Sequence, residues 1–430
     1  MMKNSQGSGF PMKKSELNRS LGINIVGHIK GEYGLGEAVR ANIRSIEAAQ
    51  IPYTLKDISV DWHRNLDDTY TDFSDDNPYP INLIQINPAA ELYNIIGDEY
   101  FRGRYNIGYW AWEMLDMIPG WEPAFGLFDE IWTLSNHCAE SIAAVSPIPV
   151  IKVMPSLVLP QPFINRELLG LPQEKFIFFF MFDFHSTTAR KNPQGLIEAF
   201  QKAFGKENKN VLLVIKFSNS KYHPEKRVQL NELAEGYPSI KFIDGHLKKE
   251  EVNALLYNCD CYVSLHRAEG FGLTMAEAMF YGKPVIATAY SSNIEFMNVG
   301  NSFLVKYQLV PNADDYGHFP KGSSIWADPD IDHAASLMQY VFHNYEQAQQ
   351  VGAIAANEIK SLLSPLVIGK KIKRRLEYIM KFSNRIKEIQ AEKNWWESQA
   401  QAWKKTAQQT QAELERAQRE SRLMHYQFQK

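Results

Sequence analysis

Residues 265–288, LHRAEGFGLTMAEAMFYGKPVIAT, constrain the fold of this chain more than any other segment. Their pattern predicts a strand, a glycine turn, a helix at about 273–281 and a second strand. We expect the helix to end at Gly282, because glycine adopts the left-handed backbone of a helix end and Pro284 cannot continue the helix. A strand–turn–helix–strand unit is typical of a parallel sheet covered by helices, so the segment indicates an α/β protein.

Two glutamates lie in this segment, with seven residues between them. Glu269 precedes the glycine turn, and Glu277 lies among apolar helical residues, where a charge seldom lacks a role. Gly270 and Gly272 let the backbone approach a ligand and leave amides at a helix N-terminus, which suits phosphate. Because carboxylates accept hydrogen bonds from sugar and ribose hydroxyls, the set indicates a nucleotide sugar. The alternative is a pair of solvated glutamates.

The segment EGFGLTMAEAM, followed by GKPVIAT, resembles the E-x7-E motif of the retaining glycosyltransferases with a GT-B fold, glycosyltransferase family 4. The resemblance extends in order from about Asn24 to about Leu376. It implies that Glu269 contacts hydroxyls of the donor sugar near the reaction centre and that Glu277 holds the ribose. It also implies donor contacts from the residues between them, namely Gly270, Phe271, Gly272, Leu273 and Thr274.

Length and composition are those of a two-domain globular protein. The chain has 430 residues, of which 45% are hydrophobic, and this length exceeds one ordinary core. A net charge of −3 argues against a general nucleic-acid binder. Three cysteines favour a reducing compartment, and Cys259 and Cys261 are expected in the core because no second Cys or His pair lies near them. No apolar run is long enough to cross a bilayer, and residues 1–20 lack the apolar core of a signal peptide, so we expect a cytoplasmic protein.

Strand and helix patterns alternate twice along the chain. Strands are expected at 23–28, 82–86, 105–109 and 130–134, and again at 176–182, 211–216, 240–244 and 261–265. Together with the resemblance, this predicts the GT-B architecture, two Rossmann-like domains facing across a cleft, plus a C-terminal coiled-coil helix. The expected parts are a flexible tail (1–20), an acceptor domain (21–165), a donor domain (166–330), return helices packing on the first domain (331–371) and the coiled-coil helix (372–430).

The last part of the chain has a heptad-like pattern. Apolar residues recur every three or four positions, as at Ile379, Phe382, Trp396, Leu414 and Phe428. Spacing of 3.5 residues predicts a coiled coil, and such a helix would be marginal alone. Self-association is the preferred hypothesis, with docking to another protein as the alternative. Basic residues open the segment, so peripheral contact with an anionic membrane and a solvated cationic face both stay open; they are Lys370, Lys371, Lys373, Arg374 and Arg375.

Arg190 and Lys191 are expected in a loop beside the glycine turn. Two cations there would stabilise the charge of a departing diphosphate. The resemblance assigns Lys191 to the lysine of the family, whereas either Arg190 or His185 takes the position of its upstream arginine. The alternative is a surface Arg–Lys pair at a helix entrance.

Several weaker patterns add candidates on both domains. Trp112 and Glu113, in an aromatic stretch, are candidates for acceptor or donor-sugar contact, although core packing accounts for at least half of these rings. Ser135, Asn136 and His137 follow a strand at the same edge and receive no role. The resemblance implies further donor contacts from two glycine-containing turns, namely Gly34 and Gly36 in the first domain and Gly245, His246 and Leu247 in the second.

The resemblance implies a retaining transferase that needs neither a metal nor another cofactor. The segments HRAEGFGLTMAEAM, FDFHS with RKNP, and YSSNIEFM resemble bacterial O-antigen (lipopolysaccharide) and polysaccharide mannosyltransferases. GDP-mannose is therefore the expected donor, and a lipid-linked glycan at the inner face of the plasma membrane is the expected acceptor. Asp328 and Asp330 are expected to cap a helix rather than to hold a metal. The alternatives are a glycan phosphorylase on the same fold and an inert scaffold acting through its coiled coil.

Overall fold

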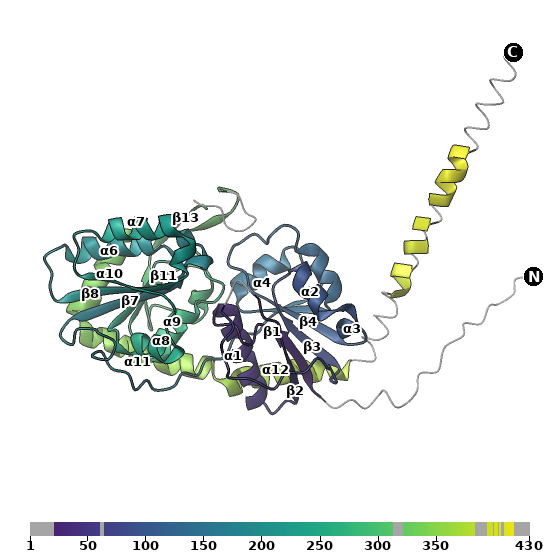
Figure 1. Ribbon diagram of the computed structural model, residues 1–430, viewed down its shortest axis with the longest axis horizontal. Helices are drawn as coiled ribbons and strands as arrows, with labels where there is room; N and C mark the ends of the chain where they lie inside the picture. Colours follow the sequence, from purple (N-terminus) through teal and green to yellow (C-terminus); the bar gives the residue numbers. More distant parts are fainter. Residues whose placement is uncertain are drawn as a thin grey trace, which may run out of the picture. The chain divides into compact units, whose positions relative to one another are not determined.

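The computed structural model of the protein describes residues 21–60, 64–312, 321–382, 394–398, 400–402, 404–405 and 408–416. The chain forms two compact units, divided between Lys373 and Arg374. The first unit contains two parallel six-stranded sheets, each with helices beside it (Figure 1). The expected tail, residues 1–20, lies outside the described residues.

The first sheet has the strand order β2-β1-β3-β4-β5-β6. Its strands are β1 (Ile23–Gly27), β2 (Tyr53–Asp57), β3 (Ile81–Gln85), β4 (Tyr105–Trp110), β5 (Glu130–Thr133) and β6 (Val150–Lys152). Its helices are α1 (Gly34–Ala48), α2 (Ala90–Ile96), α3 (Asp98–Phe101) and α4 (Asn136–Ala143). Every residue of β1 and β3 is buried, as expected for central strands covered on both faces.

The second sheet has the order β12-β11-β10-β7-β8-β9. Its strands are β7 (Phe176–Asp183), β8 (Val211–Ser218), β9 (Ile240–Asp244), β10 (Cys261–Ser264), β11 (Val285–Thr288) and β12 (Phe303–Val305). One face carries α6 (Pro193–Phe204), α7 (Pro224–Ala234) and α10 (Ile331–His343), and the other α8 (Lys249–Asn258), α9 (Leu273–Phe280) and α11 (Tyr345–Leu362) (Figure 1). The apolar run of β7 lies between β8 and β10, which confirms the expected buried central strand.

Some elements differ from the sequence expectations. The strands β2, β6 and β12 and the hairpin of β13 (Tyr307–Pro311) and β14 (Ile325–Pro329) were not predicted, because they are short or partly exposed and lack an apolar run. Helix α1 begins at Gly34, where a glycine-containing turn was expected. The helix lies so close to the preceding turn that a Cβ on Gly36 would be 2.1 Å from the carbonyl oxygen of Gly31. Gly34 and Gly36 are therefore helical residues and not loop residues.

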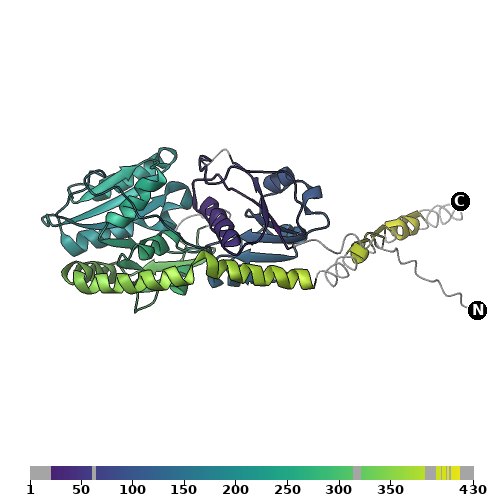
Figure 2. The same cartoon turned by 90° about the horizontal axis from the view of Figure 1, so that it is seen from below.

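The return helices do not all pack where we expected them. Helix α10 packs on α6 and α11 packs on α9, so both cover the second sheet. The chain crosses to the first domain at Leu363, whose carbonyl accepts a hydrogen bond from the Leu157 amide at 2.8 Å. Helix α12 (Pro365–Lys381) then follows (Figure 2). It packs on α1, since a Cβ on Gly369 would be 2.1 Å from the carbonyl oxygen of Ser45.

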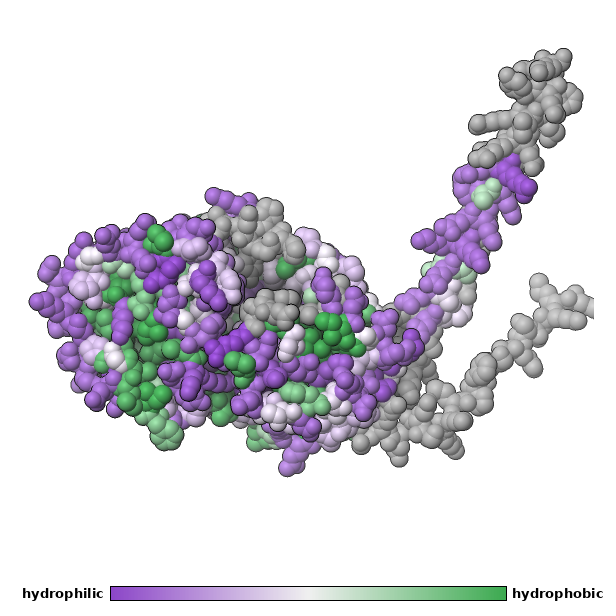
Figure 3. All heavy atoms as spheres, in the orientation of Figure 1, coloured by the Kyte–Doolittle hydropathy of each residue, from purple (hydrophilic) through white to green (hydrophobic). Residues whose placement is uncertain are grey.

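One helical stretch, Tyr345–Lys381, is long and apolar enough to cross a membrane by length and composition alone. In the structure it comprises α11 and α12, which pack on the two domains, and its most buried side chains include Ile359, Leu363, Ile368 and Ile372. Its buried side chains pack on α9 and α1, and 33% of the apolar window is buried. On the face drawn in Figure 3, hydrophilic side chains predominate and apolar ones form separate patches.

The second unit is helical where it is described. Residues 394–398, 400–402, 404–405 and 408–416 are helical, and the seam residues Trp396 and Leu414 are 65% and 53% exposed. The expected seam positions 386, 389, 393, 403, 407, 417, 421, 424 and 428 lie outside the described residues. Of the seam positions in α12, Ile379 is buried. The long C-terminal helix is confirmed within these ranges, and its pairing into a coiled coil stays a prediction.

Candidate active site

The glycine turn places backbone amides at the start of α9. Gly272, with φ of +88°, is the N-cap of α9, and no side chain caps the helix there. A side chain at this position would collide with Met275, whose Cε would lie 2.5 Å from the new Cβ. The helix ends at Phe280, and Gly282 follows its C-cap with the expected left-handed backbone, φ of +74°. The first turn of α9 can therefore receive an anion such as a phosphate.

Two cations hold the carboxylate of Glu269. Lys191 Nζ donates a hydrogen bond to Glu269 Oε1, and Arg190 Nη1 lies 3.5 Å from Glu269 Oε2. Burial alone would raise the pKa of Glu269, but the charges of Lys191 and Arg190 outweigh it and lower the pKa to about 2. Glu269 is therefore a carboxylate at neutral pH, able to accept hydrogen bonds.

The two cations lie in a short helix, α5 (Thr188–Lys191), and not in a loop. Asn192 fixes this helix with φ of +53°: its Nδ2 donates to Leu265 O at 2.9 Å, and its Oδ1 caps α6. Asn before Pro at a helix start is a known cap pattern that the sequence contained. The ring of His185 stacks on Tyr222 at 5.3 Å. Arg190 is accordingly the cation that contacts Glu269 beside Lys191.

Trp112 and Glu113 have different surroundings. The Trp112 side chain is buried, packs on Trp121 at 5.5 Å and donates to Asp116 O at 2.6 Å. Its ring belongs to the core of the first domain, and an acceptor or sugar contact by Trp112 stays a prediction. Glu113 keeps 25% of its side chain exposed, and its Oε1 lies 3.2 Å from Arg190 Nη2. Glu113 therefore stays a candidate for acceptor or sugar contact.

Glu277 lies near a second acid, Glu37 of α1. Glu37 accepts from Arg44 and from Lys249, each at 2.7 Å, and Lys249 belongs to α8 of the other domain. Burial would raise the pKa of Glu37, but Arg44, Lys249 and Arg40 lower it to about 2. Burial and the nearby charge of Glu37 raise the pKa of Glu277 to about 8. The acid predicted to hold the ribose is therefore protonated at neutral pH without ligand.

The other predicted donor contacts lie at turns, and several can offer only backbone atoms. Phe271 is buried against Phe296, with ring centroids 5.3 Å apart, and Thr274 Oγ1 accepts from Tyr262 at 2.8 Å. Gly245 follows β9 with φ of +120°, and the exposed His246 contacts Asn219 Oδ1 at 3.2 Å. The remaining predicted contacts are the half-buried Leu247 and Leu273 and the helical Gly34 and Gly36.

Sequence reasoning gave no role to several residues that surround Glu269. His266 is fully buried and contacts Ser264 Oγ and Asn293 Oδ1, both at 3.1 Å; burial lowers its pKa. Ser135 and Cys138 of the first domain contact the carbonyl of Gly270. A polar residue at the end of a buried strand is a detectable pattern for His266, whereas nothing in the sequence indicates that Ser135 meets Gly270.

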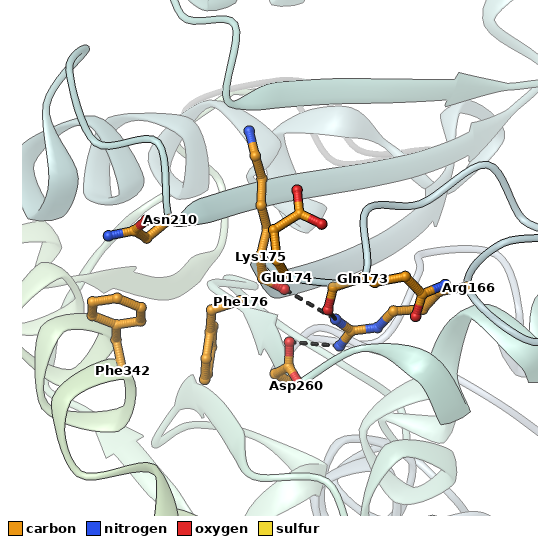
Figure 4. Close-up of a pocket in the computed structure, with 8 residues that line it drawn as sticks. All are labelled: Arg166, Gln173, Glu174, Lys175, Phe176, Asn210, Asp260 and Phe342. Carbon is orange, nitrogen blue, oxygen red and sulfur yellow. Dashed lines mark hydrogen bonds and ion pairs between the residues drawn. The ribbon is translucent and has the colours of Figure 1, made fainter.

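A separate hollow of about 410 Å³ lies at the opposite, amino-terminal ends of the strands (Figure 4). It is lined by Phe176 at the start of β7, by Asn210 before β8 and by Asp260 before β10. Arg166 at its rim donates to Asp260, Asn258, Gln173 and Lys175. Through these hydrogen bonds the guanidinium attaches the segment that connects the two domains to the second sheet.

The acidic sequence at residues 328–330 provides the cap of a helix. The Asp330 side chain accepts from the His333 amide at 2.9 Å at the start of α10, as predicted. Among the residues that the structure describes, no group of three or more His, Cys, Asp or Glu side chains could hold a metal ion. Cys259 and Cys261 are buried free thiols, which confirms them as core residues.

Comparison with known proteins agrees with this geometry. Residues 164–315 match the family model "Glycosyl transferases group 1". Among solved structures, Anabaena Alr3699/HepE in complex with UDP and glucose is similar over 84% of this chain and 100% of its own, with a TM-score of 0.57 at 15% identity.

Two further structures have the same fold. A glycosyltransferase from Rickettsia africae gives a TM-score of 0.59 at 12% identity over 84% of this chain and 99% of its own. Sucrose-phosphate synthase from Thermosynechococcus elongatus gives 0.57 at 14% identity over the same shares. A sequence search of the curated proteins found no match. The fold is thus GT-B, and the second domain of this chain is similar to the group 1 glycosyl transferases over residues 164–315.

Proposed function

We propose that this enzyme transfers mannose from GDP-mannose to a hydroxyl of a growing, lipid-linked cell-surface polysaccharide. The observation that supports transfer at this site is the contact of Glu269 with Lys191 and Arg190 beside the uncapped start of α9. The choice of mannose is supported by the three segments that resemble O-antigen mannosyltransferases. UDP-glucose is the first competitor, because the structurally similar HepE was solved with UDP and glucose.

In the proposed mechanism the residues of this site stabilise the departing diphosphate. Amides of the first turn of α9 and the cations Arg190 and Lys191 offset the negative charge that develops there. Glu269, which is ionised at neutral pH, accepts hydrogen bonds from hydroxyls of the donor sugar. Because both its oxygens face cations, we assign it no nucleophilic role and propose attack from the face that the leaving group occupies. The departing phosphate then accepts the proton of the acceptor hydroxyl.

We further propose a cytoplasmic enzyme that is peripheral to the inner face of the plasma membrane. A lipid-linked acceptor requires this location, and the exposed Lys370 and Lys371 of α12 suit an anionic surface. The C-terminal helix is proposed to join copies of the chain, and transfer is proposed to need no metal. These proposals follow from composition and from the family resemblance.

Transfer from a panel of GDP-, UDP- and dTDP-sugars, followed by product analysis, tests the donor. Glu269→Ala and Lys191→Ala should each lower kcat by about a hundredfold or more, because each removes charge complementarity at the reacting centre. Both variants should keep the circular dichroism spectrum of the parent.

Matched controls are Glu198→Ala and Lys202→Ala on α6, whose side chains form an exposed ion pair. They should transfer sugar at the parental rate. Full activity in both site variants would remove the proposed site. Consumption of inorganic phosphate would instead identify a phosphorylase, and the absence of any nucleotide binding by calorimetry would identify a scaffold.

A further inference from the structure

The backbone on either side of Glu269 is fixed by serine hydroxyls of its own domain. The Glu269 amide donates to Ser291 Oγ at 2.9 Å, and Ser292 Oγ donates to the Glu269 carbonyl at 2.7 Å. Ser291 has φ of +71°, which is unusual for a residue with a side chain. The loop after β11 therefore holds the peptide groups of Glu269 on both sides.

The next carbonyl, that of Gly270, is held by the other domain. Ser135 Oγ donates to Gly270 O at 2.9 Å, and Cys138 Sγ lies 3.2 Å from the same oxygen. Ser135 Oγ also lies 2.8 Å from Ser292 Oγ, so the two sets of contacts are continuous. Ser135, Cys138 and Ser292 are almost completely buried. Ser135 is the donor to Gly270 O, because the single proton of Cys138 goes to the Trp112 carbonyl at 2.7 Å. Since water cannot replace a lost partner there, removing the Ser135 hydroxyl leaves a buried carbonyl unsatisfied.

The absence of a side chain at Gly270 permits this contact. A Cβ at Gly270 would lie 3.3 Å from the carbonyl oxygen of Trp112 and 3.5 Å from Cγ of Glu113, both in the first domain. The same first-domain segment therefore carries Glu113, which faces Arg190, and the carbonyl that accepts from Cys138 at 2.7 Å. The first domain thus contacts the peptide that follows Glu269 directly.

We propose that Ser135 and Cys138 are positioning residues for glycosyl transfer. Ser135 donates to the Gly270 carbonyl, and Cys138 donates to the Trp112 carbonyl while its sulfur lies against the same Gly270 oxygen. Together they fix the peptide between Glu269 and the amides of α9 in the geometry that the reaction needs. The second domain does not complete this geometry alone, since the hydrogen bond from Ser135 and the contact of Cys138 Sγ both come from the first domain. The inference rests on the proposed role of Glu269 in sugar transfer.

The first test separates nucleotide binding from turnover. In the full chain, Ser135→Ala should lower kcat by about tenfold or more, because displacements of about 1 Å at a reacting centre can cost a hundredfold. The Kd for GDP or UDP, whichever the parent binds, should change less than about twofold by calorimetry, since one missing donor lies outside the nucleotide contacts. Ser135→Thr, which keeps the hydroxyl, should restore kcat.

The matched control is Ser141→Ala. Ser141 is buried on the same helix, α4, and its hydroxyl has no partner among the described residues. This variant should keep the parental kcat. Ser135 also caps α4 through the Cys138 amide at 3.1 Å, so a folding defect in Ser135→Ala is possible. In that case Cys138→Ala and Cys138→Ser carry the test, with loss of kcat in the first and recovery in the second.

Two results would overturn the inference. One is parental kcat in both Ser135→Ala and Cys138→Ala. The other is a parallel loss of kcat and GDP or UDP affinity, which a general structural role would produce. Either result leaves the proposed function intact as long as the parent enzyme transfers sugar and Glu269→Ala does not. If the parent transfers nothing from the donor panel, the proposed function fails first.

Discussion

Glu269 and Glu277 belong to one motif but have opposite electrostatic surroundings. Glu269 faces two cations, which hold its pKa near 2, whereas burial and the charge of Glu37 raise the pKa of Glu277 to about 8. At neutral pH one acid is charged and the other is neutral before a ligand binds. A ribose hydroxyl could therefore meet a carboxylic acid that both donates and accepts.

The raised pKa of Glu277 predicts a stability that depends on pH. Between pH 4.5 and about 8 the folded protein keeps a proton on Glu277 that the unfolded chain loses, so this group lowers the free energy of unfolding as pH rises. Glu277→Gln removes that loss. The difference in Tm between the variant and the parent should therefore be more favourable to the variant at pH 8.5 than at pH 5, as measured by thermal unfolding.

The depressed pKa of Glu269 acts in the opposite direction. Its contribution is present above pH 4.5 and is lost as pH falls toward 2, and it is common to the parent and Glu277→Gln. The comparison therefore isolates Glu277. An equal change of Tm with pH in both proteins would show that Glu277 titrates normally.

At the residue scale the sequence indicated the acids and cations but not what holds them. The spacing of Glu269 and Glu277 and the pattern of Arg190 and Lys191 are local, so they are visible in one segment. Ser135 meets Gly270 across 135 positions, and no periodicity relates two such distant residues. The aromatic stretch did not indicate that the Trp112 ring lies in the core, because burial of a ring depends on the packing of the whole domain.

Among the elements, close helix packing depends on Gly352 of α11. A Cβ there would lie 2.2 Å from the carbonyl oxygen of Gly282, at the end of α9. Alanine would favour the isolated helix by about 1 kcal/mol, but forcing α11 away from a backbone carbonyl costs about 1–3 kcal/mol. The clash involves backbone rather than a flexible side chain, so we expect it to prevail.

Gly352→Ala should consequently lower the free energy of unfolding by about 1–2 kcal/mol. This is the packing cost, taken in the upper part of its range, minus the gain in helix propensity. Urea unfolding followed by circular dichroism measures it. Gly126→Ala is the control, because no atom lies within 4 Å of a Cβ built there. A stability gain in Gly352→Ala would contradict the assigned packing of α11 on α9.

The predictable elements are those with long, strongly apolar patterns. Strands β7 and β9 and helix α9 match their expected positions within two residues. The hairpin β13–β14 escaped prediction because β13 is mostly exposed and neither strand has a long apolar run. The packing of α10 on α6 rather than on the first domain also could not be predicted, since an amphipathic face does not specify its partner.

At the scale of the whole molecule, the exposed apolar seam of the C-terminal helix predicts self-association. Trp396→Asp combined with Leu414→Asp places charges in the seam and should shift the protein to a smaller species in light scattering after size exclusion. Ser398→Asp, an exposed position outside the seam, is the control and should change nothing. An unchanged mass in the double variant would favour docking to another protein.

Because α12 packs on α1, the first domain can be completed only after α12 has been synthesised. Lys373 Nζ contacts the carbonyl of Ala49 across 324 positions. At ribosomal rates of about 5–20 residues per second, roughly 15–65 s pass between the synthesis of α1 and that of α12. During that interval the uncovered side of α1 is open to chaperones that bind nascent chains, and a ribosome arrested before α12 would display an unfinished first domain.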